Sequence, residues 1–105
     1  MLNKNLEIIK ENDLTYGLTF SDDSGEIDIS QWVIYFIVKD PRTLSVAINK
    51  EITDHSDPTH GISKIILTNR DTNINKGGYK YLITVKTGAG EMYSILSGTL
   101  NVKEY

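Results

Sequence analysis

The sequence predicts an all-β fold, and three observations support this prediction. The 105 residues include 29 Val, Ile and Thr residues but only 2 Ala, and β-branched residues suit strands whereas Ala is the strongest helix former. Apolar and polar residues alternate in several segments, and turn-forming residues separate these segments at intervals of about 8–12 residues. We therefore expect one domain over residues 1–105, folded as a seven-stranded antiparallel immunoglobulin-like β-sandwich.

Three strands and a turn are predicted in the first 40 residues. Leu6–Lys10 is a short apolar strand. Over Leu14–Phe20, apolar residues occupy every second position, the pattern of a half-buried strand. Ser21–Glu26 is a turn, because Asp and Ser side chains bond to nearby backbone and Gly tolerates a positive φ. The long strand Gln31–Lys39 contains seven consecutive apolar residues and ends at an Asp-Pro pair, because Pro cannot continue a hydrogen-bond ladder.

Four more strands are predicted in the rest of the chain. The weakest of them precedes the loop Asp54–Gly61, and the last two form a hairpin around Gly88–Gly90. The polar connection Asn69–Gly78 has room for one helical turn. The four strands are Ser45–Thr53, Ile62–Thr68, Tyr79–Lys86 and Met92–Val102.

The long strand Gln31–Lys39 differs from the others because it is apolar on both faces. In an antiparallel sandwich, one face of each strand normally meets the core and the other meets water. The third, sixth and seventh strands of an immunoglobulin-like domain share one sheet, so their outward side chains would form a patch on the order of a few hundred Å². We predict that this patch contacts another protein; the alternative is that a loop or the N-terminal segment covers it. The predicted contact residues are Val33, Tyr35, Ile37, Leu82, Tyr93 and Ile95.

Charge and cysteine content exclude several function classes. Lys and Arg number 11 against 14 Asp and Glu, a net charge of −3, which argues against a nucleic-acid platform or a protein that binds anionic membranes. The chain has no Cys, so disulfides and thiolate chemistry are excluded. No apolar run approaches the roughly 18 residues of a membrane-spanning helix.

Two polar clusters contain groups that bind metals, but turn chemistry explains both better. Zn²⁺ accepts imidazole and carboxylate ligands, yet the two His of the first cluster lack the i, i+4 spacing that shares a helical face. The acids of the second cluster lack the alternating ligands and the terminal Glu of a helical calcium loop. The first cluster contains Asp54, His55, Asp57 and His60, and the second contains Asp22, Asp23, Glu26 and Asp28.

No segment carries a recognisable catalytic or phosphate-binding motif. Gly77–Gly78 and Gly88–Gly90 neither precede predicted helices nor carry a Gly-Lys-Ser/Thr sequence. Trp32, Tyr79 and Tyr81 have the phase of core residues rather than of an exposed stacking platform. We therefore predict no catalytic, cofactor-binding or metal-binding residues and no enzymatic activity.

Three stretches, in order along the chain, resemble the N-terminal domain of upper baseplate proteins from phages and prophages of Gram-positive hosts. Phe20–Asp40 resembles that family's acidic turn, corner and long apolar strand. Gly61–Tyr81 resembles a strand, a Leu-Thr-x-x-Asp-Thr turn and the Gly-x-Tyr sequence of the next strand. Gly90–Val102 is similar to the family's final strand. The chain departs from the family at Gln31, where a corner Gly is usual.

The resemblance implies a non-enzymatic adaptor that contacts other virion or tail proteins and itself forms homo-oligomers. It implies a location in the virion tail after synthesis in the cytoplasm of the host bacterium. From the charge balance and the apolar runs we expect no nucleic-acid partner and no membrane insertion, and we expect no cofactor. It also implies scaffold roles for Asp71 and Thr72 in a turn and for Gly98 in close strand packing.

The second function considered is an immunoglobulin-like binding module for a cell-surface glycan or protein. Such a module would act through loops 40–45, 54–61 and 87–91. It predicts a monomer with a loop-centred site, whereas the adaptor predicts contacts through the sheet face.

Overall fold

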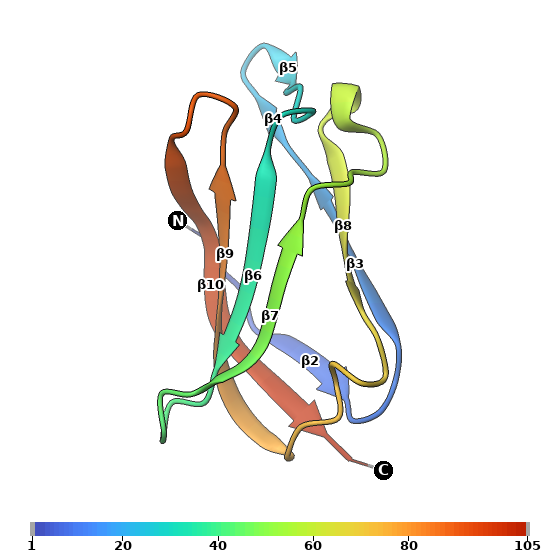
Figure 1. Ribbon diagram of the computed structural model, residues 1–105, viewed down its shortest axis with the longest axis vertical. Coiled ribbons are helices and arrows are strands. Elements are labelled where there is room, and N and C mark those ends of the chain that lie inside the picture. Colours follow the sequence, from blue (N-terminus) through green and yellow to red (C-terminus); the bar gives the residue numbers. More distant parts are fainter. Residues whose placement is uncertain (1, 105) are drawn as a thin grey trace.

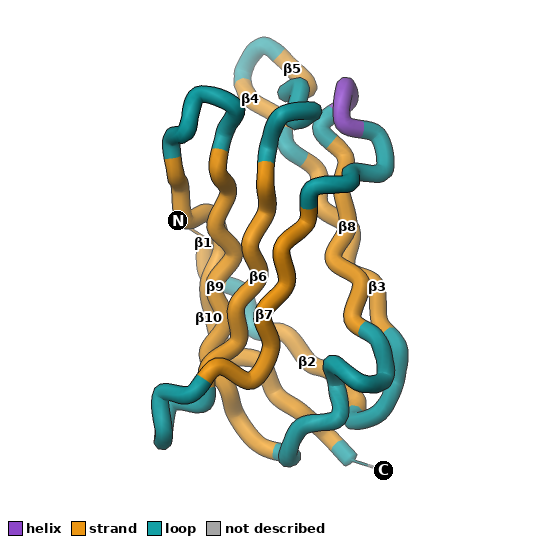
Figure 2. The backbone as a smooth tube through the Cα atoms, in the orientation of Figure 1, coloured by secondary structure: helices purple, strands orange, loops and turns teal. Residues whose placement is uncertain are grey.

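The computed structural model describes residues 2–104, which contain ten strands and no α-helix (Figure 1). The predicted all-β fold is confirmed. Figure 2 shows strands along the body of the molecule and most loops at its two ends. The strands are β1 (Leu2–Asn3), β2 (Leu6–Ile9), β3 (Leu14–Thr19), β4 (Ser21–Asp22), β5 (Gly25–Glu26), β6 (Val33–Lys39), β7 (Val46–Ile52), β8 (Ile62–Leu67), β9 (Gly77–Lys86) and β10 (Met92–Lys103).

Two sheets face each other across the core. The larger sheet has the order β1-β10-β9-β6-β7, and β2 also pairs with β10. The smaller sheet consists of β3 and β8, which lie beside and behind the larger sheet in Figure 1. β4 and β5 form a separate small hairpin within the turn predicted at Ser21–Glu26.

The purely antiparallel pairing that the sequence predicted is wrong at one edge of the larger sheet. β1 and β2 run parallel to β10, with Leu2 opposite Leu96 and Leu6 opposite Leu100. Nearly the whole chain separates these strands, so no tight turn dictates their relative direction. The larger sheet is therefore mixed, and the described residues do not reproduce the seven antiparallel strands.

The N-terminal segment passes closely over β10 between β1 and β2. The Lys4 amide donates to the Ser97 carbonyl at 2.9 Å, and the Lys4 carbonyl accepts a hydrogen bond from the Tyr81 hydroxyl. A Cβ at Gly98 would lie 2.1 Å from the Lys4 carbonyl oxygen. Only glycine allows this approach, which is the close strand packing expected for Gly98.

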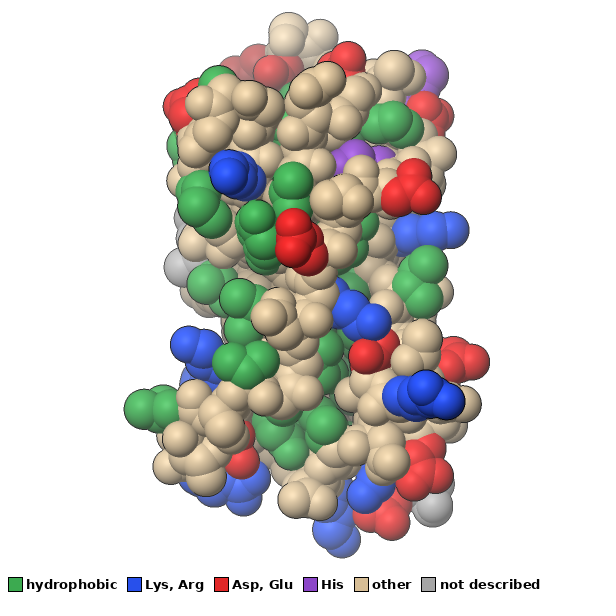
Figure 3. All heavy atoms as spheres, in the orientation of Figure 1, with side chains coloured by type: hydrophobic (Ala, Val, Ile, Leu, Met, Phe, Trp, Pro, Cys, Tyr) green, Lys and Arg blue, Asp and Glu red, His purple; other side chains and the backbone are tan. Residues whose placement is uncertain are grey.

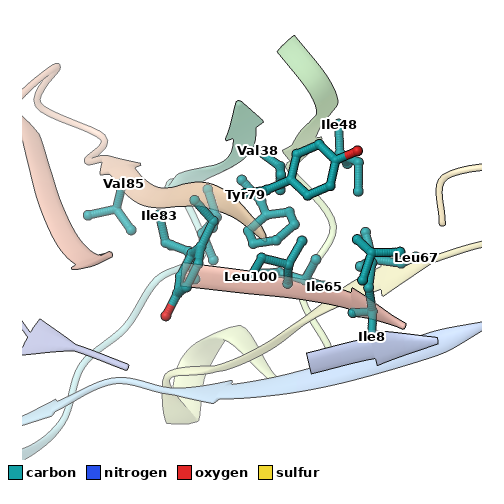
Figure 4. Close-up of a cluster of buried hydrophobic side chains, with 13 residues drawn as sticks. Ile8, Val38, Ile48, Ile65, Leu67, Tyr79, Ile83, Val85 and Leu100 are labelled. Atoms are coloured by element: carbon teal, nitrogen blue, oxygen red, sulfur yellow. The ribbon is translucent and has the colours of Figure 1, made fainter. Parts of the chain in front are cut away.

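The core follows the strand phases that the sequence predicts. Ile34, Phe36 and Val38 of β6 are completely buried, and Ile65 and Leu67 of β8 meet them from the smaller sheet. Figure 4 shows Val38, Ile65 and Leu67 in one cluster with side chains of β2, β7, β9 and β10. The inward residues predicted in β9 are also buried: Tyr79, Tyr81, Ile83 and Val85.

A single helical turn forms in a different connection from the predicted one. The segment 69–76 contains turns and bends, and Gly77 and Gly78 already belong to β9. The short 3₁₀ helix η1 (Pro58–His60) lies instead within the loop predicted at Asp54–Gly61. Pro58 presets φ for the first helical position, and Gly61, at φ 72°, ends the turn in the left-handed region.

Candidate protein-contact surface

Strand register determines which side chains share the outer face of the larger sheet. Tyr35 of β6 lies opposite Thr84 of β9, and Ile37 lies opposite Leu82. Thr84 in turn lies opposite Ser94 of β10. Because directly opposite residues point to the same side of a sheet, these residues form adjoining rows on one face. Figure 3 shows hydrophobic side chains gathered over β6 and β9 on the visible side.

Four of the six predicted contact residues lie together on this face. Each is half-buried, and none belongs to the core or to the partly buried residues packed against it. β6 and β9 each have a strand on both sides, and side chains on a central strand are flanked by those neighbours. We define the outer apolar patch as Val33, Tyr35, Ile37 and Leu82.

The N-terminal segment does not lie over the outer apolar patch. β1 and β2 extend the sheet at the edge of β10, and Ile8 of β2 is buried in the core with Leu6 packed against it. The segment therefore covers the inner side of the sandwich. Of the two segments that could have covered the patch within the chain, a loop or the N-terminal segment, the second is therefore excluded.

Tyr93 and Ile95 do not share the face predicted for them. A β-bulge shifts the register between Ser94 and Leu96 and leaves Ile95 without an opposite residue. An extra residue reverses the alternation beyond it, so Tyr93 lies opposite the buried Val85 and shares the inner phase. Tyr93 extends past the core and is 50% exposed, whereas Ile95 packs against the core cluster.

The same bulge places a residue on the outer face that the sequence reasoning missed. Met92 lies opposite Lys86, which lies opposite Val33 on its other side, and Met92 is 59% exposed. Val46 of β7, opposite Lys39, also joins this face and is 53% exposed. A second register irregularity, between Val38 and Lys39, brings Val46 to that position. No sequence pattern near Ser94 or near Val38 predicts these register shifts.

His55, a candidate zinc ligand, holds loop to strand in the structure. The carbonyl oxygen of Trp32 can only accept, so His55 Nε2–H donates to it at 2.8 Å, and Nδ1 shares a hydrogen bond of 2.8 Å with the Ser63 hydroxyl. Ser63 is 1% exposed. The His-Ser contact is therefore closed to a substrate, and the imidazole joins the loop after β7 to β8 and to the start of β6.

His60 belongs to an exposed group of charges near η1. Its Nδ1 lies 2.9 Å from Asp57, and its Nε2 lies 3.9 Å from Glu26 of β5. The hydrogen bond to Asp57 and the nearby carboxylates raise the pKa of His60 above its usual value of 6.5. The His60 ring thus lies between η1 and the β4–β5 hairpin.

Two of the four acidic residues in the other cluster form local turns. Asp22 accepts from the amide and hydroxyl of Ser24, and Asp28 does the same with Ser30. These hydrogen bonds lower the pKa of both carboxyls. Within residues 2–104 there is no group of three or more His, Asp or Glu placed to hold a metal ion.

Asp71 and Thr72 connect the turn after β8 to its surroundings. The Asp71 carboxylate accepts from the Thr68 amide at 2.8 Å and pairs with Lys50 of β7 at 2.7 Å. Burial raises the pKa of Asp71, but the hydrogen bonds from Lys50 and Thr68 outweigh burial and lower it overall. The buried Thr72 hydroxyl donates to the Asn12 carbonyl at 2.8 Å. These contacts join the edge of the larger sheet to the smaller one.

The loops proposed for the alternative function divide between the two ends of the molecule. β6 runs antiparallel to both β7 and β9, so loop 40–45 lies at the opposite end from loops 54–61 and 87–91 (Figure 1). The β4–β5 hairpin shares the end with loops 54–61 and 87–91. No helix in the described part of the chain is long and apolar enough to cross a membrane.

Comparison with known proteins supports an immunoglobulin-like β fold. No family model matches the sequence, and no curated protein matches it. A structure from work on multimeric cell-adhesive interactions of VGSC β subunits superposes with a TM-score of 0.53 at 14% identity, covering 96% of this chain and 92% of that one. The extracellular domain of the voltage-gated sodium channel β4 subunit, described as parallel homodimers, gives 0.49 at 13% identity, covering 98% and 92%. At these identities the likeness concerns the fold alone.

Proposed function

We propose that the chain is a non-enzymatic immunoglobulin-like sandwich module that contacts other proteins through the outer face of its larger sheet. We further propose that it is an adaptor of a phage or prophage tail, at the baseplate. The three stretches that resemble upper baseplate proteins support the tail assignment, and the geometry of the sheet supports the contact.

The observation that carries the contact function is the outer apolar patch. Val33, Tyr35, Ile37 and Leu82 sit on the two central strands of the larger sheet and face away from the core. Met92 and Val46 are exposed on the same face, each opposite a lysine at one end of the patch. Contiguous apolar surface of this kind usually marks a contact with another protein.

Crosslinking in assembled particles tests this proposal. A photoreactive residue in place of Tyr35 is expected to crosslink to a tail protein in particles purified from the producing bacterium, with the product identified by mass spectrometry. The matched control places the same residue at Ile66, which is exposed on the smaller sheet. Absence of the chain from the particles would refute the tail assignment, and equal crosslinking from both positions would refute the outer face as the contact.

A binding module for a cell-surface glycan or protein remains the second candidate. The observation that favours it is the gathering of loops 54–61 and 87–91 and the β4–β5 hairpin at one end. The cell-adhesive interactions described for the VGSC β subunits belong to a fold of this kind. Saturable binding to intact cells that is lost on shortening loop 87–91 and kept in Ile37→Glu would favour this candidate over the adaptor.

A further inference from the structure

Three lysines stand at the two ends of the outer apolar patch. Lys39 of β6 lies directly opposite Lys80 of β9, and Lys86 lies opposite Val33 at the far end. On the outer face of β6, β7, β9 and β10, the acidic residue beside the outer apolar patch is Glu51, which lies opposite Tyr35. A chain with a net charge of −3 thus presents positive charge at this patch.

The Lys39–Lys80 juxtaposition has no compensation inside the described chain. Like charges directly opposite each other on neighbouring strands destabilise a sheet. Two of the other lysines have partners: Lys50 pairs with Asp71 at 2.7 Å, and Lys103 pairs with Glu7 at 3.2 Å. Among residues 2–104, no ion pair joins Lys39, Lys80 or Lys86 to a carboxylate. The sheet therefore pairs two lysines across neighbouring strands without an internal ion pair.

A small, mainly apolar hollow lies beside these two lysines. It is lined by Ile37, Leu82 and Tyr81 together with Lys39 and Lys80. An apolar hollow next to two lysines is complementary to a partner segment in which a Leu or Met side chain is flanked by carboxylates. Ion pairs at the margin of an interface add specificity and speed association more than they add affinity.

A second copy of the chain fits this face poorly. Stacking two identical outer faces brings Lys39, Lys80 and Lys86 of both copies together, against one Glu51 from each. The interface would then carry an excess of positive charge, and like charges facing across an interface oppose association. Charge complementarity points instead to a different protein.

We propose that the outer face binds an acidic partner protein, which places an apolar side chain over Ile37 and Leu82 and pairs its carboxylates with the adjacent Lys39 and Lys80. This inference rests on the proposed function, because it names the partner chemistry of the same surface. It places the predicted homo-oligomer, where one forms, on another surface of the chain.

Peptide titration monitored by amide NMR shifts tests the inference. The probe is acetyl-Glu-Leu-Glu-amide, with acetyl-Lys-Leu-Lys-amide and acetyl-Glu-Gly-Glu-amide as matched controls. At about 20 mM salt we expect the acidic leucine peptide to bind at least about fivefold more tightly than either control, a ratio that one or two surface charge pairs supply. The shifts should centre on Ile37, Lys39, Lys80 and Leu82, and they should weaken severalfold at about 200 mM salt because screening shortens the range of exposed charges.

Lysine variants locate the effect. Lys39→Gln with Lys80→Gln should abolish the preference for the acidic peptide, whereas Lys64→Gln, on the smaller sheet, should leave it unchanged. Equal binding of the acidic and basic peptides, or shifts centred elsewhere, would overturn the inference. So would a wild-type dimer at low salt in sedimentation that Leu82→Asp dissociates, because the occupant would then be a second copy. A dimer of this kind would overturn the acidic partner but would still agree with the outer face as a protein contact. Failure of Tyr35 to crosslink in assembled particles would instead refute the proposed function itself.

Discussion

Strands β6 and β8 both bury every second side chain but differ on their outer faces. On β6, Ile34, Phe36 and Val38 are buried while the outward apolar residues Val33, Tyr35 and Ile37 are half-buried. On β8, Ile65 and Leu67 are buried while Ile62 and Ile66 are 38% and 50% exposed. The inner faces of the two strands are equivalent, and the difference is confined to the side away from the core.

The number of neighbouring strands explains this difference. β6 lies between β7 and β9, and β9 adds Leu82 beside Ile37. β8 pairs only with β3 in the described residues, and β3 places Thr15, Gly17 and Thr19 beside its outward residues. Apolar residues on a central strand therefore merge into one surface, whereas those on β8 remain separate. Isolated exposed apolar residues are ordinary on a protein surface, and a merged patch is not.

The largest expected effect tests whether the two inner faces are equivalent. Phe36→Ala on β6 and Ile65→Ala on β8 both remove a completely or almost completely buried side chain. Each should lower the free energy of unfolding by about 2–5 kcal/mol, because a cavity replaces core contacts. Urea denaturation followed by tryptophan fluorescence measures this. A loss below about 1 kcal/mol for Ile65→Ala alone would show that the smaller sheet contributes less to the core than its burial indicates.

An effect of intermediate size is expected from replacing one glycine in each sheet. Gly98→Ala in β10 places a methyl group on the Lys4 carbonyl, and we expect a loss of about 1–3 kcal/mol from the forced shift of the N-terminal segment. Gly17→Ala in β3 meets no atom within 4 Å and should raise stability by about 0.4–1 kcal/mol, because alanine reduces the entropy of the unfolded chain. Thermal unfolding of the two variants beside the wild type compares them. Equal destabilisation by both would contradict the close packing at Gly98.

The ion pair that joins the two sheets predicts a pH dependence. Because the folded-state pKa of Asp71 lies below its unfolded value of 3.8, its stabilisation is present above that value and is lost as pH falls through the lowered folded pKa. Asp71→Asn should cost about 1–2 kcal/mol at pH 7 from the loss of charge-assisted hydrogen bonds. The variant should converge with the wild type in denaturation experiments at acidic pH. Lys103→Gln, which breaks an exposed pair, is the control and should change stability by less than about 1 kcal/mol.

The smallest effect on stability is expected from substitutions on the outer faces of β6 and β8, and these substitutions test directly whether the two faces differ in function. Ile37→Glu on β6 and Ile66→Glu on β8 should each change the free energy of unfolding by no more than about 1 kcal/mol, since neither side chain belongs to the core. Only Ile37→Glu should be lost from assembled particles, as measured by quantitative mass spectrometry. Loss of both variants from the particles, or of neither, would contradict the prediction that only the outer face of β6 contacts another protein.

The strand positions and the inner faces could be predicted from the sequence, and part of the outer face could not. Phe36 and Tyr81 follow a local period of two, which any strand with one buried side must obey. Tyr93 was placed on the wrong face because the bulge after Ser94 reverses the phase. A bulge is set by how two strands meet, and neither Ser94 nor Ile95 carries a local signal for it. Met92 was missed for the same reason.

The sequence by itself determined that this chain is built of strands, where most of them lie and which residues of β6 and β9 face the core. These properties follow from residue type and alternation, which act within a few neighbouring positions. Only the tertiary structure decided that β2 lies parallel to β10, that bulges reset the faces of Tyr93 and Met92, and that Lys39 stands opposite Lys80. Each of these depends on pairing between residues distant in the chain, and no local pattern carries the register of such a pair.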